Sequence, residues 1–223
     1  MKHIIAFLRK QKYEVLLAAL LQHLFIGIFL SDLPFYTHVI WPVNMIILGL
    51  ASVSVFVGKS RWKSITRYVL FIAVVALPLC LPLIRNIRGF MPYLCTAYVI
   101  FYIFIFWEIM RFLVKPGYIN TDIISAAACG YLLLIEISVF LLQSLLYRDP
   151  TVFKGVDISG PAATYMDLVY FCSITITSIG FGDIVPNTAC TKLITSLFGI
   201  AGQFYTVVLV GILISKFSSR TSS

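Results

Sequence analysis

Residues 175–186 read Thr-Ile-Thr-Ser-Ile-Gly-Phe-Gly-Asp-Ile-Val-Pro and lie between two apolar stretches that are each long enough to cross a membrane. We call these twelve residues the signature segment. Its glycines, Gly180 and Gly182, stand two residues apart, and glycine adopts positive φ at low steric cost. Successive carbonyl groups of such a segment can point the same way, toward one axis. A Gly-x-Gly pattern is common in loops, so its interpretation depends on the surrounding sequence.

The surrounding sequence gives the segment a specific interpretation. An apolar span comes first, then a short amphipathic stretch from about Tyr165 to Ile176, the signature segment with a turn at 183–186, and a second apolar span. Non-helical backbone at membrane depth is tolerated only where protein buries it or where it lines a water-filled cavity. This order therefore predicts a helix, a re-entrant helix, an ordered loop and another helix.

The segment resembles the signature sequence of the potassium channel family, which has a hydroxyl residue, an aliphatic residue, Gly, an aromatic residue, Gly and Asp: Ser178, Ile179, Gly180, Phe181, Gly182 and Asp183. In such filters, rings of backbone carbonyls replace the hydration shell of the ion. The resemblance implies that potassium binds at the carbonyls of Ser178, Ile179, Gly180 and Phe181. It places the Ser178 hydroxyl at the cavity end of this filter and Thr177 just beneath it. Potassium is then the permeant ligand, and no cofactor is expected.

Three departures from the family pattern concern the support of the filter. Ser178 replaces the usual Thr and keeps the hydroxyl, whereas Phe181 replaces the usual Tyr and loses a hydrogen bond. Ile174 stands where some simple bacterial channels have Glu, so Asp183 needs another partner. The resemblance places Tyr170 behind the filter, and we expect its hydroxyl to bond the Asp183 carboxylate.

The composition indicates a membrane protein independently of the motif. Of 223 residues, 60% are hydrophobic and 12% are charged, against roughly 45–50% and about 25% in soluble domains. At about 20 residues for each crossing, six spans are expected, at residues 14–30, 39–58, 68–84, 92–112, 122–146 and 191–216. We therefore predict an all-α membrane protein with six transmembrane helices, in which a re-entrant pore helix and selectivity filter lie between helices five and six.

The predicted spans divide into a four-helix membrane unit, residues 1–114, and a pore domain, residues 122–217. A linker at 115–121 separates them, and residues 218–223 form a short cytoplasmic tail. The chain contains one filter motif, whereas an axial pore needs carbonyls from all sides. Four copies should therefore assemble as a closed homotetramer in membrane lipid.

If the N-terminus is cytoplasmic, the termini and loops on the cytoplasmic side hold more basic residues than the loops on the outer side. The positive-inside rule then predicts a multi-pass protein of the cell membrane, inner or plasma, with both termini cytoplasmic. The net charge of +8 follows from this topology and does not indicate a nucleic-acid partner. A cleavable signal peptide is the competing interpretation of the N-terminus. We prefer a retained first helix, because the run at 14–30 does not end in a small-x-small cleavage site.

The sixth span should carry the gate. The resemblance places Gly202 at the family's hinge position, and four residues on one helical face from there should line the cavity and inner mouth: Gln203, Thr206, Val210 and Ile214. The predicted fourth span has no arginine before Arg111, whereas a voltage sensor needs several. We therefore do not expect conventional voltage sensing.

Ionisable residues within the spans and the cysteines point less clearly to a function. His23, Glu108 and Glu136 are ionisable groups within predicted spans, which are costly there and often functional, but we favour hydrogen bonds between helices. The five cysteines lack metal-ligand spacing and should be free thiols. A less selective monovalent cation channel is the main alternative to a potassium channel. An uptake transporter subunit would need four pore loops in one chain, a non-conducting partner would not need a whole filter, and an enzyme would need a catalytic cluster.

Overall fold

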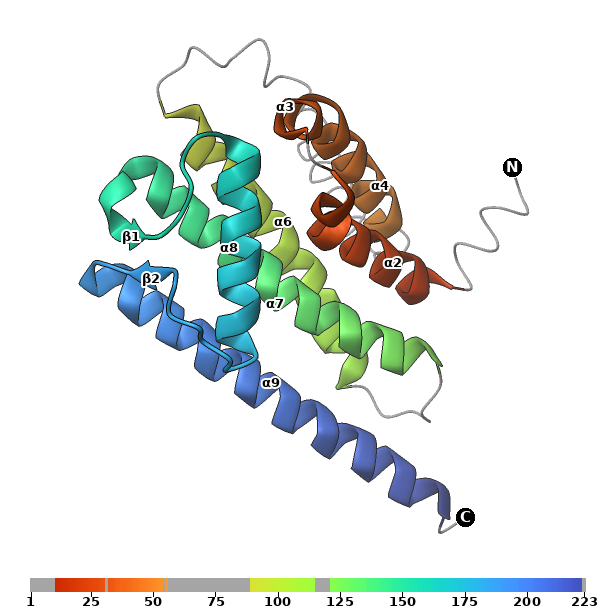
Figure 1. Cartoon of the computed structure of the whole chain (residues 1–223). Helices are drawn as coiled ribbons and strands as arrows, with labels where there is room; N and C mark the ends of the chain where they lie inside the picture. Colours follow the sequence, from red (N-terminus) through yellow and green to blue (C-terminus); the bar gives the residue numbers. More distant parts are fainter. Residues whose placement is uncertain (1–10, 31, 54, 56–88, 115–120, 222–223) are drawn as a thin grey trace.

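The computed structural model describes residues 11–30, 32–53, 55, 89–114 and 121–221, with the backbone alone at 210 and 212–221. Helices dominate this part of the chain (Figure 1). The order of elements is α2 (Lys12–Phe25), η1 (Ile26–Phe29), α3 (Leu33–Phe35), η2 (Tyr36–Ile40), α4 (Trp41–Val53), α6 (Phe90–Leu113), α7 (Thr121–Arg148), η3 (Pro150–Val152), β1 (Phe153–Lys154), α8 (Pro161–Ile176), β2 (Val185–Pro186) and α9 (Ala189–Thr221).

Within the described residues, five stretches are long and apolar enough to cross a membrane: Lys12–Phe29, Leu33–Ser52, Phe90–Leu113, Thr121–Arg148 and Ala189–Leu209. They correspond to five of the six predicted spans, and the third, at 68–84, lies outside the described residues. The prediction of an all-α membrane protein is confirmed at this level. One small exception is an antiparallel pair between β1 and β2, each of two residues. The predicted division of the chain into two membrane units stays a prediction.

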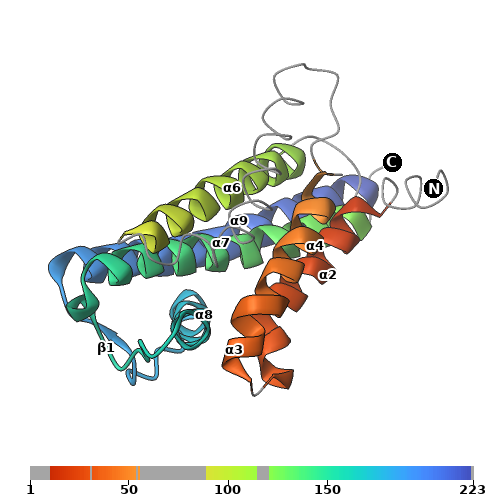
Figure 2. The same cartoon turned by 90° about the horizontal axis from the view of Figure 1, so that it is seen from above.

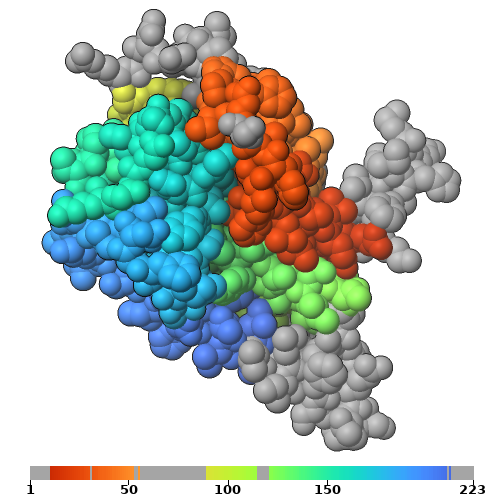
Figure 3. Space-filling model, viewed as in Figure 1, coloured from red at the N-terminus to blue at the C-terminus, as the bar shows by residue number. Residues whose placement is uncertain are grey.

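Helix α7 is the centre of the structure. It contacts α2, α6, α8 and α9, and it is buried along most of its length. Helices α6, α7 and α9 run in similar directions, whereas α8 lies at an angle to them (Figures 1 and 2). Residues of α3 and η2 pack against the same α8 (Figure 3). The described N-terminal helices and the helices of the predicted pore domain therefore share one core.

Aromatic rings form one part of this core. Phe140 of α7 lies against four rings from three other helices, with centroid distances of 4.9 Å to Tyr98, 5.6 Å to Tyr102, 5.6 Å to Tyr165 and 6.2 Å to Trp41. All five residues are buried. Aromatic pairs at such distances add stabilisation beyond the area they bury. This cluster fixes α8 against α4, α6 and α7.

Helix α8 begins at Pro161, whereas the amphipathic pattern predicted a start at about Tyr165. Proline is favoured in the first turn because its missing N–H would have no partner there, and its fixed φ suits the helix. Gly160 is the N-cap residue. The predicted end of the helix at Ile176 is confirmed.

Helices α7 and α9 meet where a glycine faces a tyrosine. The Tyr205 hydroxyl of α9 donates a hydrogen bond of 2.7 Å to the Ala127 carbonyl of α7. A Cβ at Gly130 would overlap that hydroxyl. The glycine therefore allows the two helices to approach closely enough for the bond.

We predict that Gly130→Ala displaces Tyr205, breaks its bond to Ala127, and lowers the free energy of unfolding by about 1–3 kcal/mol, the usual cost of overpacking. Thermal melting of the purified protein in detergent measures this change. Gly211→Ala is the matched control, because a Cβ at Gly211 would meet nothing within 4 Å. Equal melting temperatures for the two variants would show that this contact does not hold α9 to α7.

Candidate functional site

The backbone of the signature segment alternates in conformation. Gly180 and Gly182 have φ of +57° and +83°, which confirms the positive φ expected from the sequence. Ser178 also has a positive φ, of +62°, and it is the one non-glycine residue with this conformation in the described part of the chain. Positive φ at a residue with a Cβ carries a steric cost. The surrounding contacts must therefore hold Ser178 in place.

The C-terminal end of α8 provides part of that hold. The Ile179 and Gly180 amides both donate to the Ile174 carbonyl, at 2.8 and 3.1 Å, and the Ser178 amide donates to the Thr175 carbonyl at 3.0 Å. These bonds turn the chain back from the end of the helix. The amides of Ser178, Ile179 and Gly180 thus point toward α8.

Four consecutive carbonyl oxygens of the segment remain without a protein partner. Within the described residues, no hydrogen bond is made to the carbonyls of Ser178, Ile179, Gly180 and Phe181. The segment is also open on one side, where Ile179 is 57% exposed and Phe181 is 70% exposed. A row of unpaired carbonyls can coordinate a cation in place of water.

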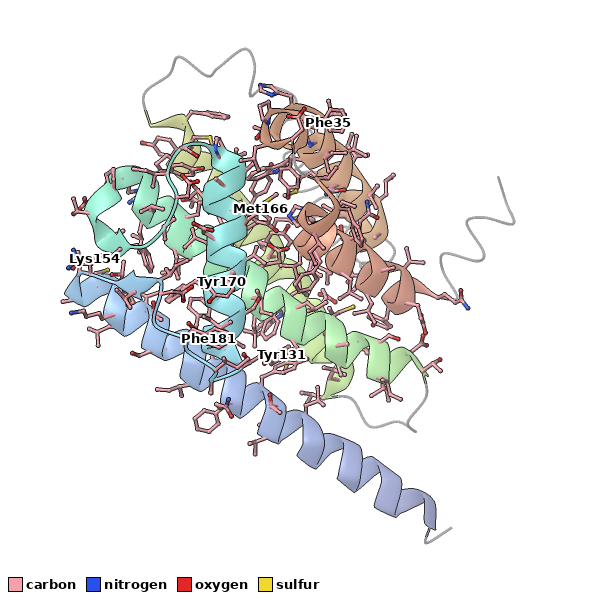
Figure 4. The ribbon with its side chains drawn as sticks, in the orientation of Figure 1. Phe35, Tyr131, Lys154, Met166, Tyr170 and Phe181 are labelled. Atoms are coloured by element: carbon pink, nitrogen blue, oxygen red, sulfur yellow. The ribbon has the colours of Figure 1, made fainter. Side chains whose placement is uncertain are left out.

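Tyr170 and Asp183 form the hydrogen bond that the sequence predicted. The Tyr170 hydroxyl donates to Oδ2 of Asp183 at 2.8 Å. The Tyr170 ring also stacks on the Phe181 ring, with centroids 6.4 Å apart and planes 6° from parallel, and Figure 4 shows the two side chains together between α8 and α9. The hydrogen bond from Tyr170 lowers the pKa of Asp183 below its ordinary value. Asp183 is therefore a carboxylate at neutral pH.

A clamp at the outer end of the segment was not predicted from the sequence. Residues 183–186, expected to be a turn, include strand β2, which pairs with β1 in the loop before α8. The Asn187 side chain donates to the Thr151 carbonyl at 2.9 Å, and the Thr191 hydroxyl donates to the Val152 carbonyl at 3.1 Å. Two-residue strands give almost no periodic signal, so the sequence did not indicate this pairing.

The inner end of the segment meets α9. Nε2 of Gln203 donates to the Ser178 hydroxyl at 2.7 Å. The role of Gln203 as a pore-lining residue stays a prediction. The Thr177 hydroxyl instead turns back to the Ser173 carbonyl at 2.7 Å. The contact from Gln203 was not predicted, because spacing along one helix says nothing of how near it lies to a loop.

Gly202 packs closely against the end of α8. A Cβ there would lie 2.6 Å from Cγ2 of Ile176, and α9 continues through Gly202 without a break. The glycine thus has a packing reason in addition to the expected hinge role, which stays a prediction. Thr206 is exposed on α9. Val210 and Ile214 also lie in α9, but their side chains are outside the described residues.

The ionisable residues of the spans find partners in two ways. Glu108 lies 3.5 Å from Arg111, three residues further along the same helix. Glu136 accepts a hydrogen bond from Tyr165, which confirms bonding between helices, and His23 lies beside it at 3.7 Å. The proximity of His23 to Glu136 was not predicted, because the two residues are far apart in the sequence.

Cysteines and metal-ligating residues add nothing further to the site. The four described cysteines, Cys95, Cys129, Cys172 and Cys190, are free thiols as predicted, and Cys80 lies outside the described residues. Among the residues that the structure describes, no three His, Cys, Asp or Glu side chains are grouped to hold a metal ion.

Comparison with known proteins finds similarity to ion channels over the region that contains this site. The family model described as "Ion channel" matches residues 130–219. The chain is 41% identical to two-pore potassium channel 1 of Arabidopsis thaliana over 51 residues, which is 23% of this chain and 13% of that protein. It is 34% identical to two pore potassium channel b of Oryza sativa subsp. japonica over 82 residues, or 36% of this chain and 22% of that protein.

Two-pore potassium channel 3 of Arabidopsis thaliana gives a similar result, with 34% identity over 84 residues, 38% of this chain and 18% of that protein. The chain thus spans less than a quarter of the length of these curated relatives. No solved structure gives a significant match. The match to the ion channel family model includes the signature segment. Residues 130–219 are therefore similar to an ion channel domain, and part of the chain is similar to potassium channels.

Proposed function

We propose that the chain is a potassium-selective ion channel, in which four copies surround a central pore and conduct potassium passively. The observation that carries the proposal is the row of unpaired carbonyls at residues 178–181, on a backbone with positive φ at every second residue. A dehydrated cation needs several oxygens around it, and one chain supplies them from one side. The four carbonyl levels then bind potassium, with the Ser178 hydroxyl as the innermost ligand.

The surface of α9 supports a closed assembly. Large apolar residues recur at spacings of three and four residues along it, which places them on one face, and all are exposed: Leu193, Leu197, Ile200, Phe204 and Val207. Such a continuous apolar face needs cover from lipid or protein. In a cyclic homotetramer the pore-facing side meets the other copies, and membrane lipid covers the remainder.

The length of α8 supports a re-entrant pore helix. Its 16 residues extend about 24 Å, which is shorter than the hydrocarbon layer of about 30 Å. The segment after it returns to α9 instead of crossing. We infer six spans in the whole chain, with the third at 68–84, and a cell-membrane topology with both termini cytoplasmic, in accord with the distribution of basic residues.

The gate is proposed on α9. Gln203, Thr206, Val210 and Ile214 share the pore-lining face, and a ring of four bulky apolar side chains can close a pore by excluding water. Val210 and Ile214 are nearest the cytoplasmic end and supply this ring, with Gly202 as the point of flexure.

A less selective monovalent cation channel is the second candidate, and one observation favours it. Phe181 replaces the usual tyrosine and cannot donate a hydrogen bond behind the filter, so the outer filter depends on the bond between Tyr170 and Asp183. A filter with one polar brace for each chain can widen more easily than one with two. The ratio of potassium to sodium permeability separates the two candidates.

We predict that the purified protein in liposomes passes potassium in preference to sodium, and that Gly180→Ala or Gly182→Ala abolishes this preference. A Cβ at either position meets nothing within 4 Å in its own chain, so the effect comes from positive φ, which costs an L-residue roughly 1–2 kcal/mol. Reversal potentials with potassium on one side and sodium on the other measure the preference.

Gly160→Ala is the control for these variants, because Gly160 has an extended backbone with φ of −172° and open space around its Cα. It should conduct and select like the unmodified chain. Equal permeability of the two ions in the unmodified chain would reject the potassium-selective reading in favour of the second candidate.

We further predict that Tyr170→Phe speeds the loss of current in low external potassium and initially leaves selectivity unchanged. Asp183→Asn should have a similar effect, and the double variant should be no worse than the more impaired single variant, because both remove one bond. Tyr93→Phe serves as control, since Tyr93 is an exposed tyrosine on α6. Additive effects of the first two changes would rule out a shared brace.

External pH tests the same bond. The pKa of Asp183 is lowered by the Tyr170 hydrogen bond, so the stabilisation is present above the ordinary aspartate pKa of about 3.9 and is lost as pH falls through the lowered value. Current decay in the unmodified channel should therefore be the same at external pH of about 8 and about 5. Faster decay at pH 5 would show that the carboxylate is not held in this way.

We predict from the proposed gate that Val210→Asp or Ile214→Asp raises the open probability, because a ring of carboxylates keeps the constriction wet. Single-channel recording measures the open probability, and Val210→Leu, which keeps an apolar ring, should remain closed for as long as the unmodified channel. If neither aspartate variant opens more, the filter itself is the gate.

A further inference from the structure

A buried polar cluster joins three helices. Glu136 of α7, His23 of α2 and Tyr165 of α8 are 0%, 1% and 1% exposed. The Tyr165 hydroxyl donates to the two Glu136 carboxyl oxygens at 3.2 and 3.4 Å. Nε2 of His23 lies 3.7 Å from Oε1 of the same carboxyl. We call these three residues the Glu136 cluster.

The surroundings of the Glu136 cluster exclude water. The Tyr165 ring lies 5.3 Å from Trp41 and 5.6 Å from Phe140, and the His23 ring lies 5.5 Å from Tyr165. A carboxyl group at such a site is expensive unless it is paired. Ionisable groups inside membrane segments are therefore rarely without a role.

Tyr165 connects the cluster to the proposed filter. It lies on α8 five residues before Tyr170, a rotation of about 140° around the helix, so the two tyrosines leave α8 in widely different directions. Tyr165 bonds Glu136 on the core side, and Tyr170 bonds Asp183 on the filter side. Hydrogen bonds thus fix α8 to α7 on one side and to the filter on the other.

His23 connects the cluster to the first span. Its Nε2 lies 3.7 Å from Glu136, which is longer than a hydrogen bond. A shift of α2 toward α7 by about 1 Å would form a hydrogen bond here, and a shift away would separate the two groups. A second contact lies one turn after His23 along the first span. There, a Cβ at Gly27 would be 2.7 Å from Cε of Met166 on α8. Figure 4 shows Met166 on the side of α8 that faces this N-terminal helix. The first span therefore touches α8 at two successive turns.

We propose that Glu136 is a positioning residue for the filter, which holds the pore helix through Tyr165 and is itself linked to the first span through His23. The N-terminal helices then influence the stability of the filter through this buried contact. The inference rests on the proposed channel function, because it assigns a role to residues that touch no ion. It also gives the N-terminal helices a function other than voltage sensing.

The test compares two equally buried tyrosines of the same aromatic cluster. Tyr165→Phe removes the hydroxyl that bonds Glu136, whereas Tyr102→Phe removes a buried hydroxyl that has no hydrogen-bond partner among the described residues. In low external potassium, Tyr165→Phe should speed the loss of current by about two- to tenfold, the range expected for one net hydrogen bond. Tyr102→Phe should leave the rate unchanged.

The first-span link is tested by His23→Leu and Glu136→Gln. The amide of Glu136→Gln can still accept the Tyr165 hydrogen bond, but an NH2 group replaces one of the two carboxyl oxygens beside His23. Each variant should alter the rate of current loss, and the double variant should match the larger single effect. Potassium selectivity measured at the start of each recording should stay normal in all of these variants. This measurement is the control that the filter is still assembled.

Amide hydrogen exchange of α8 in the same variants does not depend on conduction. Faster exchange in Tyr165→Phe than in Tyr102→Phe supports the inference even if the unmodified protein is not potassium-selective, in which case the proposed function fails separately. Equal exchange and equal current loss in the two tyrosine variants overturn the inference. Additive effects of His23→Leu and Glu136→Gln overturn the link to the first span.

Discussion

The carbonyl oxygens of residues 178–181 are the constraint on which the rest of the structure depends. An amide can be satisfied by the end of a helix, and here the Ile174 carbonyl accepts from two of them. Within the described residues, the four carbonyl oxygens accept no hydrogen bond from the protein and need a partner from outside it. In the proposed tetramer, a potassium ion at the centre of four such segments meets this requirement. The exposed side of the segment then faces the ion.

The neighbouring elements are arranged to keep this backbone in an unfavourable conformation. Ser178, with positive φ and a Cβ, is bonded by its amide to α8 and by its hydroxyl to Gln203 of α9. At the outer end, Tyr170 and the pairing of β1 with β2 fix the segment's exit. Local strain of this kind persists only where the surroundings over-determine it. The aromatic core around Phe140 and the Glu136 cluster hold α8, to which the segment is attached.

Much of this could be predicted from the sequence, where one chemical need identified one residue. Ile174 stands where some simple bacterial channels have Glu, so Asp183 needed another partner, and the family resemblance placed the Tyr170 hydroxyl behind the filter. Positive φ at Gly180 and Gly182 followed from the residue type. The apolar spans followed from their length, and five of them fall within the described residues.

The remaining features depend on tertiary contacts that carry no local signal. Ser178 has no residue-type preference for positive φ, and its conformation follows from neighbours on two other helices. His23 and Glu136 are brought together by the packing of α2 on α7. The sequence pattern of either helix alone does not indicate this packing. The start of α8 at Pro161 was missed because the amphipathic pattern is weak in its first turn.

Anomalous X-ray scattering from crystals soaked in thallium(I), a heavy ion that substitutes for potassium, tests whether four copies of residues 178–181 bind potassium. We expect a row of peaks on a fourfold axis, beside the carbonyls of Ser178, Ile179, Gly180 and Phe181. Sodium in place of thallium or potassium should not occupy these positions in the same way. An assembly without that axis, or thallium bound elsewhere with none beside residues 178–181, would contradict this expectation.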